Sequence, residues 1–252
     1  MPSKKRLDLV LVEKGFVQSR QRAQALIMAG KVLVNNKPID KPGVAVSIND
    51  DIAIKGEDIP YVSRGGLKLK EALQSLHVNI DGFVCLDVGA STGGFTDCLL
   101  QHGAKCVYAV DVGYGQLAWK LRQNPRVVVI ERTNIRYMPN KIIPLPVDLI
   151  TIDVSFISLK IVVPAALKFL KKNGRILALI KPQFEVGKGK VGKGGIVRDI
   201  ALHDEVIKDL SFFFTGLGLL CKSVIPSPIH GANGNREFII SLVHGYKFFD
   251  KS

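Results

Sequence analysis

The sequence contains few cysteines and no hydrophobic run long enough to cross a membrane. Its 252 residues include four cysteines and no Cys-x-x-Cys pair, which argues against a disulfide scaffold or a zinc site and fits a reducing compartment. The most apolar stretch, 142–170, is interrupted by prolines and charged residues, whereas a membrane helix needs about 18 consecutive apolar residues. The basic N-terminus lacks the apolar segment of a secretory signal. We therefore expect a cytoplasmic protein with no membrane span and no structural metal.

The composition is that of a globular protein with an excess of positive charge. Hydrophobic residues make up 47% of the chain and charged residues 23%, which is enough apolar material for a buried core and excludes a disordered chain. Lysine and arginine number 35 against 22 acidic residues, giving a formal net charge of +13. This excess favours an anionic partner, either nucleic acid or an acidic membrane surface.

The first 60 residues predict a small α+β domain. The apolar spacing indicates one helix over 7–14, ended by Gly15, and a second that begins after Ser19 and ends at Gly30. Short strands are expected over 32–35 and 44–54, with a turn-rich stretch between them. Basic residues lie on or beside these elements, and they form either a solvated face or a surface that binds RNA phosphates.

Several short matches in this region together resemble an S4-type RNA-binding domain. They are Arg6-Leu7-Asp8, Ser19-Arg20, Ala23, Leu26-Ile27, Gly30, Val32, Val34-Asn35 and Lys41-Pro42. The resemblance implies a structured RNA as the partner. The residues that we expect to contact RNA are Arg6, Ser19, Arg20, Arg22, Lys31, Lys37, Lys41 and, beyond this domain, Arg64.

From residue 64 onward, predicted helices alternate with short apolar strands. We expect strands over 83–88, 106–110, 127–130, 147–152 and 175–180, and helices over 65–76, 95–102 and 158–170. Regular β–α alternation predicts a doubly wound parallel sheet, a Rossmann-like α/β fold. A helix over 202–215 then precedes strands over 219–225 and 237–243. Because the link from 226 to 236 has no helical pattern, these last two strands should be antiparallel.

A glycine-rich turn follows the first strand of this sheet. In Asp-Val-Gly-Ala-Ser-Thr-Gly-Gly-Phe-Thr-Asp, residues 87–97, the glycines allow a tight turn and a close approach of a ligand to the backbone. Asp111 ends the second strand, and an acidic residue at this spacing can accept hydrogen bonds from a ribose diol. The pattern is neither Gly-x-Gly-x-x-Gly nor a Walker A loop, which argues against ATP or GTP as the ligand.

This turn resembles the S-adenosyl-L-methionine site of FtsJ/RrmJ-like 2′-O-methyltransferases. The resemblance implies that Asp111 holds the ribose of the cofactor, and that Asn134 and Asp153 flank its adenine and methyl side. The complete set of expected cofactor residues is Asp87, Gly89, Ala90, Ser91, Gly93, Gly94, Phe95, Thr96, Asp111, Val112, Asn134 and Asp153.

Four charged residues form the predicted catalytic group. Asp153 and Lys181 each follow a strand of the parallel sheet, and Glu237 begins the last strand, whose antiparallel direction brings its start to the same edge. Lys68 lies on the helix that leads into the sheet. Together they resemble a Lys-Asp-Lys-Glu methyltransferase tetrad. A ribose 2′-hydroxyl is a weak nucleophile, and we expect Lys181 to accept its proton while the carboxylates fix the geometry.

The order of these parts resembles the TlyA family, whose members are named haemolysins but act as ribosomal RNA (cytidine-2′-O)-methyltransferases. It implies an S4-like domain over 1–60, a linker over 61–66 and an FtsJ-like methyltransferase domain over 67–252, with ribosomal RNA or a ribosomal subunit as the partner. Two alternatives remain: a non-catalytic RNA-binding factor in ribosome assembly, and a membrane-active haemolysin. The segment 187–195, rich in glycine and lysine, is either an RNA clamp or a solvated loop.

Overall fold

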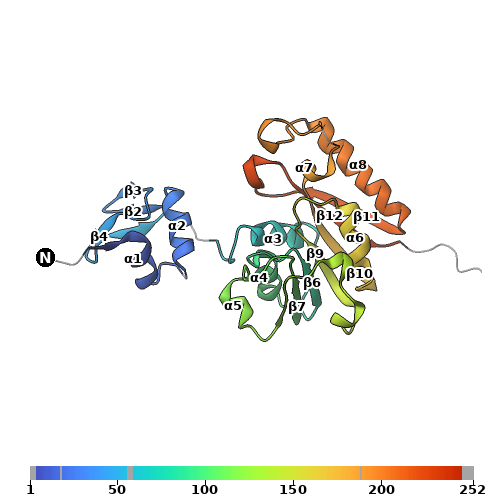
Figure 1. Cartoon of the computed structure of the whole chain (residues 1–252), viewed down its shortest axis with the longest axis horizontal. Helices are drawn as coiled ribbons and strands as arrows, with labels where there is room; N and C mark the ends of the chain where they lie inside the picture. The colour runs from blue at the N-terminus through green and yellow to red at the C-terminus, as the bar shows by residue number, and fades with distance from the viewer. Residues whose placement is uncertain (1–3, 18, 56–58, 188, 246–252) are drawn as a thin grey trace, which may run out of the picture. The chain divides into compact units, whose positions relative to one another are not determined.

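The computed structural model describes residues 4–17, 19–55, 59–187 and 189–245 (Figure 1). The chain folds into two compact units, residues 1–58 and 59–252, which are described separately. None of the described helices is long and apolar enough to span a membrane.

The described residues of the smaller unit form two helices and five short strands. These are β1 (Lys4–Arg6), α1 (Leu7–Glu13), α2 (Arg20–Met28), β2 (Val32–Val34), β3 (Lys37–Ile39), β4 (Ala45–Ser47) and β5 (Ile52–Ile54). Strands β3, β2 and β5 form one antiparallel sheet in that order, and β1 pairs with β4. Apolar side chains of α1 and α2, Leu11 and Ile27 among them, are buried against the strands.

Two parts of the smaller unit differ from the sequence prediction. Residues 37–39, expected in a turn, form β3, because Asn35 and Asn36 both adopt positive φ and close a tight hairpin with β2. The single strand expected over 44–54 is divided into β4 and β5. The carboxylate of Asp50 accepts a hydrogen bond from the Ser47 amide at 2.8 Å and stabilises the turn between them.

A seven-stranded sheet forms the centre of the larger unit. Its strands are β6 (Val84–Val88), β7 (Cys106–Val110), β8 (Val127–Ile130), β9 (Val147–Ile152), β10 (Leu170–Ile180), β11 (Leu219–Pro226) and β12 (Phe238–His244). The order is β11-β12-β10-β9-β6-β7-β8, and β12 runs in the opposite direction to the other six strands. The predicted doubly wound sheet with an antiparallel last strand is confirmed. β10 begins five residues earlier than predicted, with an irregularity between Leu170 and Arg175.

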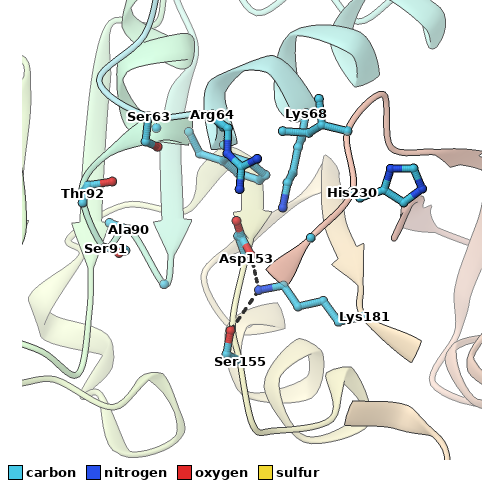
Figure 2. A pocket seen from close by; sticks show the side chains of 16 residues that line it. Ser63, Arg64, Lys68, Ala90, Ser91, Thr92, Asp153, Ser155, Lys181 and His230 are labelled. Carbon is cyan, nitrogen blue, oxygen red and sulfur yellow. Dashed lines mark hydrogen bonds and ion pairs between the residues drawn. The ribbon is translucent and has the colours of Figure 1, made fainter. Parts of the chain in front are cut away.

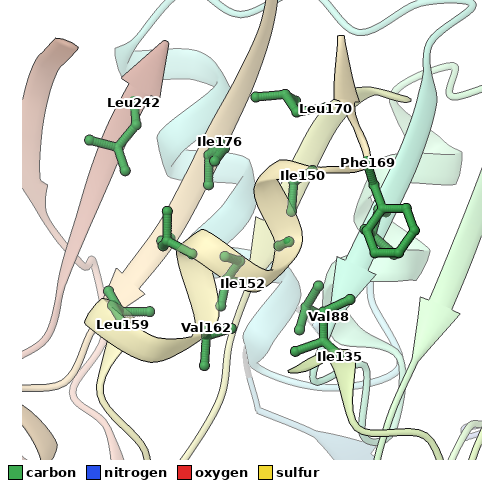
Figure 3. Close-up of a cluster of buried hydrophobic side chains, with 14 of the residues drawn as sticks. Val88, Ile135, Ile150, Ile152, Leu159, Val162, Phe169, Leu170, Ile176 and Leu242 are labelled. Carbon is green, nitrogen blue, oxygen red and sulfur yellow. The ribbon is translucent and has the colours of Figure 1, made fainter. Parts of the chain in front are cut away.

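Helices cover both faces of this sheet. They are α3 (Gly65–Ser75), α4 (Gly94–Gln101), α5 (Trp119–Arg122), α6 (Leu159–Leu167), α7 (Pro182–Glu185) and α8 (Ile200–Gly216), with short 3-10 turns at Ile135–Tyr137, Asn140–Ile142, Lys193–Gly195 and Ala232–Gly234. Alternate strand residues face opposite sides. Ile150 and Ile152 pack with Val162 of α6 (Figure 3). Leu210 of α8 belongs to the same cluster, whereas Leu149 packs on the side of α3 and α4.

The segment 61–66, which we expected to be a linker, belongs to the larger unit. Tyr61 is buried, and the Val62 amide donates to the carboxylate of Asp97 on α4 at 2.9 Å. The side chain of Gln101 donates to the Pro60 carbonyl at 2.8 Å. These contacts fix the segment on α4, and α3 begins within it at Gly65.

Candidate active site

A cavity of about 310 Å³ lies where β6, β9 and β10 end. The carboxyl ends of parallel strands are the usual ligand site of such a sheet. The start of α3, the glycine-rich turn after β6, the ends of β9 and β10, and the loop before β12 line it (Figure 2). Its residues are Ser63, Arg64, Gly65, Lys68, Gly89, Ala90, Ser91, Thr92, Gly94, Phe95, Asp153, Ser155, Lys181, Ile229, His230 and Gly231.

The backbone of the turn after β6 approaches its neighbours closely at two glycines. Gly89 has φ +84°, and a Cβ there would lie 2.4 Å from the Asp153 carbonyl oxygen. A Cβ on Gly94 would lie 2.2 Å from Ser63 Oγ and 3.0 Å from the Gly66 nitrogen. A side chain at either position would therefore displace neighbouring protein atoms, and the two glycines let the turn pack closely against the segments beside it along the cavity.

Asp87 and Thr96, expected beside the cofactor, instead form a buried network beneath the turn. The Asp87 side chain is fully buried and accepts hydrogen bonds from Thr96 Oγ1 at 2.7 Å and Thr151 Oγ1 at 3.0 Å. Burial raises the pKa of Asp87 to about 6, although these hydrogen bonds oppose the shift. The network joins β6, α4 and β9, and it supports the turn from below.

Asp111 joins the glycine-rich turn to the turn after β7. Its Oδ2 accepts from the Ser91 amide and its Oδ1 from the Gly113 amide, both at 2.7 Å. Ser91 is held there with φ +48°. Asp111 lies outside the lining of the cavity, next to Val112, which is exposed.

Two other residues predicted to hold the cofactor also lie outside the lining of the cavity. The side chain of Asn134 caps the turn at Ile135–Tyr137 by accepting from the Arg136 amide at 3.1 Å. Gly93 packs against Leu117 and Leu121. Of the predicted cofactor residues, those that line the cavity are Gly89, Ala90, Ser91, Gly94, Phe95 and Asp153.

Lys181 and Asp153 form an ion pair at the edge of the sheet. Lys181 Nζ lies 2.7 Å from Asp153 Oδ1 and donates to Ser155 Oγ at 3.0 Å (Figure 2). Asp153 directly follows β9 and Lys181 directly follows β10, and these strands are parallel neighbours with Ile152 opposite Ala178. The topology therefore brings the two charges together, as the sequence predicted.

Lys68 and Glu237 form a second, more deeply buried ion pair. Lys68 Nζ lies 2.6 Å from Glu237 Oε2, and the two side chains are 10% and 2% exposed. Glu237 immediately precedes β12, whose antiparallel direction brings this carboxylate to the carboxyl ends of the parallel strands. Lys68 extends from α3 toward Asp153 in Figure 2. Lys68, Asp153 and Lys181 line the cavity, and Glu237 holds Lys68 from outside its lining.

Several lining residues were not predicted from the sequence. Ser63, Thr92, Ser155 and His230 all present polar side chains at the cavity. Ser155 stands two positions after Asp153, and His230 lies in the link before the last strand. Both positions are in irregular loops next to predicted site residues, and that adjacency was the only signal in the sequence.

The predicted RNA-binding arginines of the smaller unit share one acidic partner. Arg6 donates from Nε and Nη2 to the Asp8 carboxylate, each at 3.0 Å, and Arg20 Nε donates to it at 2.9 Å. The Asp8 side chain is fully buried, whereas the two arginines are about half exposed. Chiefly through the hydrogen bonds from Arg6, these contacts hold the pKa of Asp8 well below its usual range. Both arginines therefore stabilise the unit as well as forming part of its surface.

The other predicted RNA-binding residues have different surroundings. Ser19 Oγ caps α2 by accepting from the Arg22 amide at 3.2 Å. Lys31, Lys37 and Lys41 are exposed. Arg64 belongs to the larger unit and points into the cavity described above.

Comparisons with known proteins match both units. The FtsJ-like methyltransferase family matches residues 61–244, and the S4 domain matches residues 5–52. YqxC of Bacillus subtilis, named as a candidate rRNA methyltransferase, is 50% identical over 244 residues, covering 96% of this chain and 87% of that protein. The 16S/23S rRNA (cytidine-2′-O)-methyltransferase TlyA of Mycobacterium tuberculosis is 45% identical, covering 96% and 91%. The solved structure of a candidate hemolysin from Streptococcus thermophilus superimposes with a TM-score of 0.77 at 42% identity, covering 98% and 90%.

Proposed function

Because the chain belongs to the FtsJ-like methyltransferase family, we propose that it transfers a methyl group to the ribose 2′-hydroxyl of a cytidine in ribosomal RNA. The methyl donor is S-adenosyl-L-methionine. The S4 domain and the names of the related proteins support ribosomal RNA as the substrate. The protein acts on this RNA in the cytoplasm, where ribosomes are found.

The residues around the cavity fit such a donor. The glycine-rich turn lines the cavity at Gly89 and Gly94, where a Cβ would collide with neighbouring protein atoms. Asp111 stands at the end of the adjacent strand, where a carboxylate can accept hydrogen bonds from a ribose diol. When bound, the donor supplies a methyl group already activated on a positively charged sulfur. We infer that the turn holds this molecule and that Asp153 lies near its methyl end.

Lys181 is the proposed proton acceptor. In the reaction a new bond forms between the ribose oxygen and the methyl carbon, the bond from that carbon to sulfur breaks, and the hydroxyl proton moves to a base. Lys181 Nζ donates a hydrogen bond to Ser155 Oγ and forms an ion pair with Asp153. These two contacts hold the amine in place, and the ribose hydroxyl is proposed to approach it from the cavity.

Lys68 and Glu237 are proposed to act as a unit beside this amine. The carboxylate of Glu237 balances the charge of Lys68 in a buried position, where an unpaired cation would be costly. Lys68 Nζ is thereby held at the wall of the cavity that Lys181 also lines. A substituted Glu237 would leave Lys68 without its carboxylate and so disturb its position.

The observation that carries the proposal is the ion pair of Lys181 and Asp153 beside the glycine-rich turn. The test is to map ribose 2′-O-methylation on ribosomal RNA from cells with and without the gene. We expect at least one cytidine to lose the modification in the deletion strain and to regain it when purified protein and S-adenosyl-L-methionine are added. An unchanged map would contradict the proposal, and RNA binding without methyl transfer would favour the assembly factor.

A further inference from the structure

A second hollow, of about 450 Å³, lies in the larger unit between the segment that precedes α8 and the loop that precedes β12. Arg198 and Arg236 line it from the two sides, together with His203 and Asn233. The rest of the lining includes apolar side chains, among them Ile196 and Ile200. The hollow is separate from the cavity at the ends of β9 and β10, with which it shares no lining residue.

Hydrogen bonds between the two segments fix the walls of this hollow. The Asn235 side chain is buried; it accepts from the Val197 amide at 3.0 Å and donates to the Gly195 carbonyl at 2.9 Å. His203 is also buried, and its Nε2 lies 2.9 Å from the Val197 carbonyl oxygen. Neighbouring buried groups therefore fix the backbone at Arg198 and Arg236. A ligand would not have to pay the entropic cost of ordering this backbone when it binds.

Arg198 and Arg236 are both exposed residues. Across residues 4–17, 19–55, 59–187 and 189–245, no acidic side chain forms an ion pair with either one. The neighbouring carboxylate of Asp199 is used to cap α8, where it accepts from the Ala201 amide at 2.9 Å. Two uncompensated guanidiniums at one fixed hollow favour an anion, and their planar donor geometry matches a phosphate.

We propose that this hollow, the Arg198–Arg236 site, binds a phosphodiester of the RNA strand that carries the target nucleotide. The inference rests on the proposed function and extends it to a second contact with the substrate. Arg236 directly precedes Glu237, and His230 and Gly231 of the same loop line the cavity. One loop therefore connects the phosphate contact to the reaction site. A strand held at Arg236 is held at a defined place relative to the ribose in the cavity.

A polymer fits this site better than a free anion. The two guanidiniums supply charge, but the lining otherwise offers few side-chain donors that could enclose a small phosphate. A single contact between a guanidinium and a phosphate contributes little binding free energy in water. An RNA strand makes several such contacts along its length, and their contributions add up. The salt dependence of RNA binding is the expected signature, because each neutralised phosphate releases counterions.

The test uses two double variants. The first, the arginine variant, combines Arg198→Ala and Arg236→Ala; the second, the lysine variant, combines Lys105→Ala and Lys172→Ala and removes the same amount of charge. Lys105 and Lys172 are exposed and lie near the amino ends of β7 and β10, away from the carboxyl edge. Affinity for ribosomal RNA from the deletion strain is measured over a range of salt concentrations. We expect the arginine variant to bind about 10-fold or more weakly, with the slope of log K against log salt reduced by about 1 to 2. The lysine variant should change affinity by less than about threefold.

Further measurements separate this inference from the proposed function. S-adenosyl-L-methionine affinity by calorimetry and the thermal midpoint should be unchanged in the arginine variant, and Arg198→Lys with Arg236→Lys should recover part of the RNA affinity. Equal RNA affinity in the arginine and lysine variants would overturn the site. Binding of inorganic phosphate or a mononucleotide, lost in the arginine variant while RNA affinity is unchanged, would also overturn it. Absence of methyl transfer by the wild-type protein would instead count against the proposed function.

Discussion

Lys181 Nζ lies 2.7 Å from Asp153 Oδ1, although helix α6 and the whole of strand β10 separate the two residues in the chain. The strand order of the sheet explains why these two side chains lie close together. Each residue is the first after its strand, and the two strands are parallel neighbours. The same edge carries the glycine-rich turn and, through the antiparallel β12, the carboxylate of Glu237. The amine of Lys181, which can take part in proton transfer, therefore lies at the same edge of the sheet as the glycine-rich turn that is proposed to hold the methyl donor.

Ser155 is expected to orient the amine of Lys181. It accepts a hydrogen bond from Lys181 Nζ at 3.0 Å, and a hydrogen bond to a charged group typically contributes about 1.5–3 kcal/mol. Ser155→Ala should lower kcat about 10-fold or more, whereas KM for RNA and affinity for the methyl donor should change little. Ser155→Thr keeps the hydroxyl and should recover most of the activity. A kcat equal to wild type in the alanine variant would show that Asp153 alone positions the amine.

Gly94 is expected to be needed for binding of the methyl donor. An added Cβ would lie 2.2 Å from Ser63 Oγ and 3.0 Å from the Gly66 nitrogen, so Gly94→Ala should shift the start of α4 or α3. Overpacking of this kind costs about 1–3 kcal/mol. We expect donor affinity, measured by calorimetry, to fall about 10-fold. Gly216→Ala is the matched control, because a Cβ there meets nothing within 4 Å. Equal losses in both variants would contradict the prediction.

Asp87 should make the larger unit less stable as the pH rises from about 4 to about 7. Burial raises the pKa of this carboxyl to about 6, above its ordinary value near 4, so the folded state binds the proton more tightly than the unfolded state. The stabilisation is present below pH 4 and is lost as the pH passes through 6. A difference of about two pKa units corresponds to about 3 kcal/mol.

The variant Asp87→Asn removes this titration while retaining an acceptor for Thr96 or Thr151. Urea unfolding of wild type and variant at several values between pH 4 and pH 7 measures the difference in the free energy of unfolding. Wild type should lose about 2–3 kcal/mol relative to the variant across that interval. Parallel pH profiles for the two proteins would mean that Asp87 does not titrate in this range.

The exposed lysines of the smaller unit should contribute to RNA affinity through charge. The triple variant Lys31→Ala, Lys37→Ala and Lys41→Ala removes three exposed cations, none of which forms an ion pair in the described part of this unit. Removing a lysine that neutralises one phosphate should reduce the salt slope by about 0.7 to 0.9. A slope reduced by about 2, measured by RNA titration at several salt concentrations, is the expected result.

The control for the lysine variant removes three charges elsewhere, at Lys105, Lys172 and Lys222. All three are exposed residues of the larger unit. This control should leave the slope within about 0.5 of wild type, because general charge acts weakly beyond about 10 Å at moderate salt. If the two triple variants have the same slope, the smaller unit does not bind RNA through these lysines.

Those parts of the site that follow directly from strand order could be predicted from the sequence. Asp153 and Lys181 each follow a short, mostly apolar run, and such runs are identifiable because buried parallel strands have both faces covered. The antiparallel last strand followed from a link too short for a crossover helix. That direction places Glu237 at the same edge as the other two residues.

The surroundings of several other predicted residues could not be predicted from the sequence. They depend on tertiary contacts that leave no pattern in the local sequence. Asp87 resembles a ligand-binding residue by position, but its side chain is occupied by Thr96 and by Thr151, which is 64 residues away. Arg6 and Arg20 read as RNA contacts, yet both also bind the buried carboxylate of Asp8. His230 enters the cavity from an irregular loop whose path is set by contacts such as the Gly231 amide with the Asn235 carbonyl at 2.9 Å. The periodicity of apolar residues does not predict which of these polar side chains form hydrogen bonds or ion pairs with one another.

The proposed reaction depends on the amine of Lys181, which accepts a proton from the substrate. The most direct test is single-turnover methyl transfer to ribosomal RNA from the deletion strain by wild type, Lys181→Ala and Lys181→Arg. Arginine keeps the positive charge but cannot act as a base. Both variants should lose at least about 1000-fold in rate while RNA and S-adenosyl-L-methionine affinities stay within about threefold of wild type. A Lys181→Arg variant that retains a tenth or more of the wild-type rate would contradict this role of Lys181.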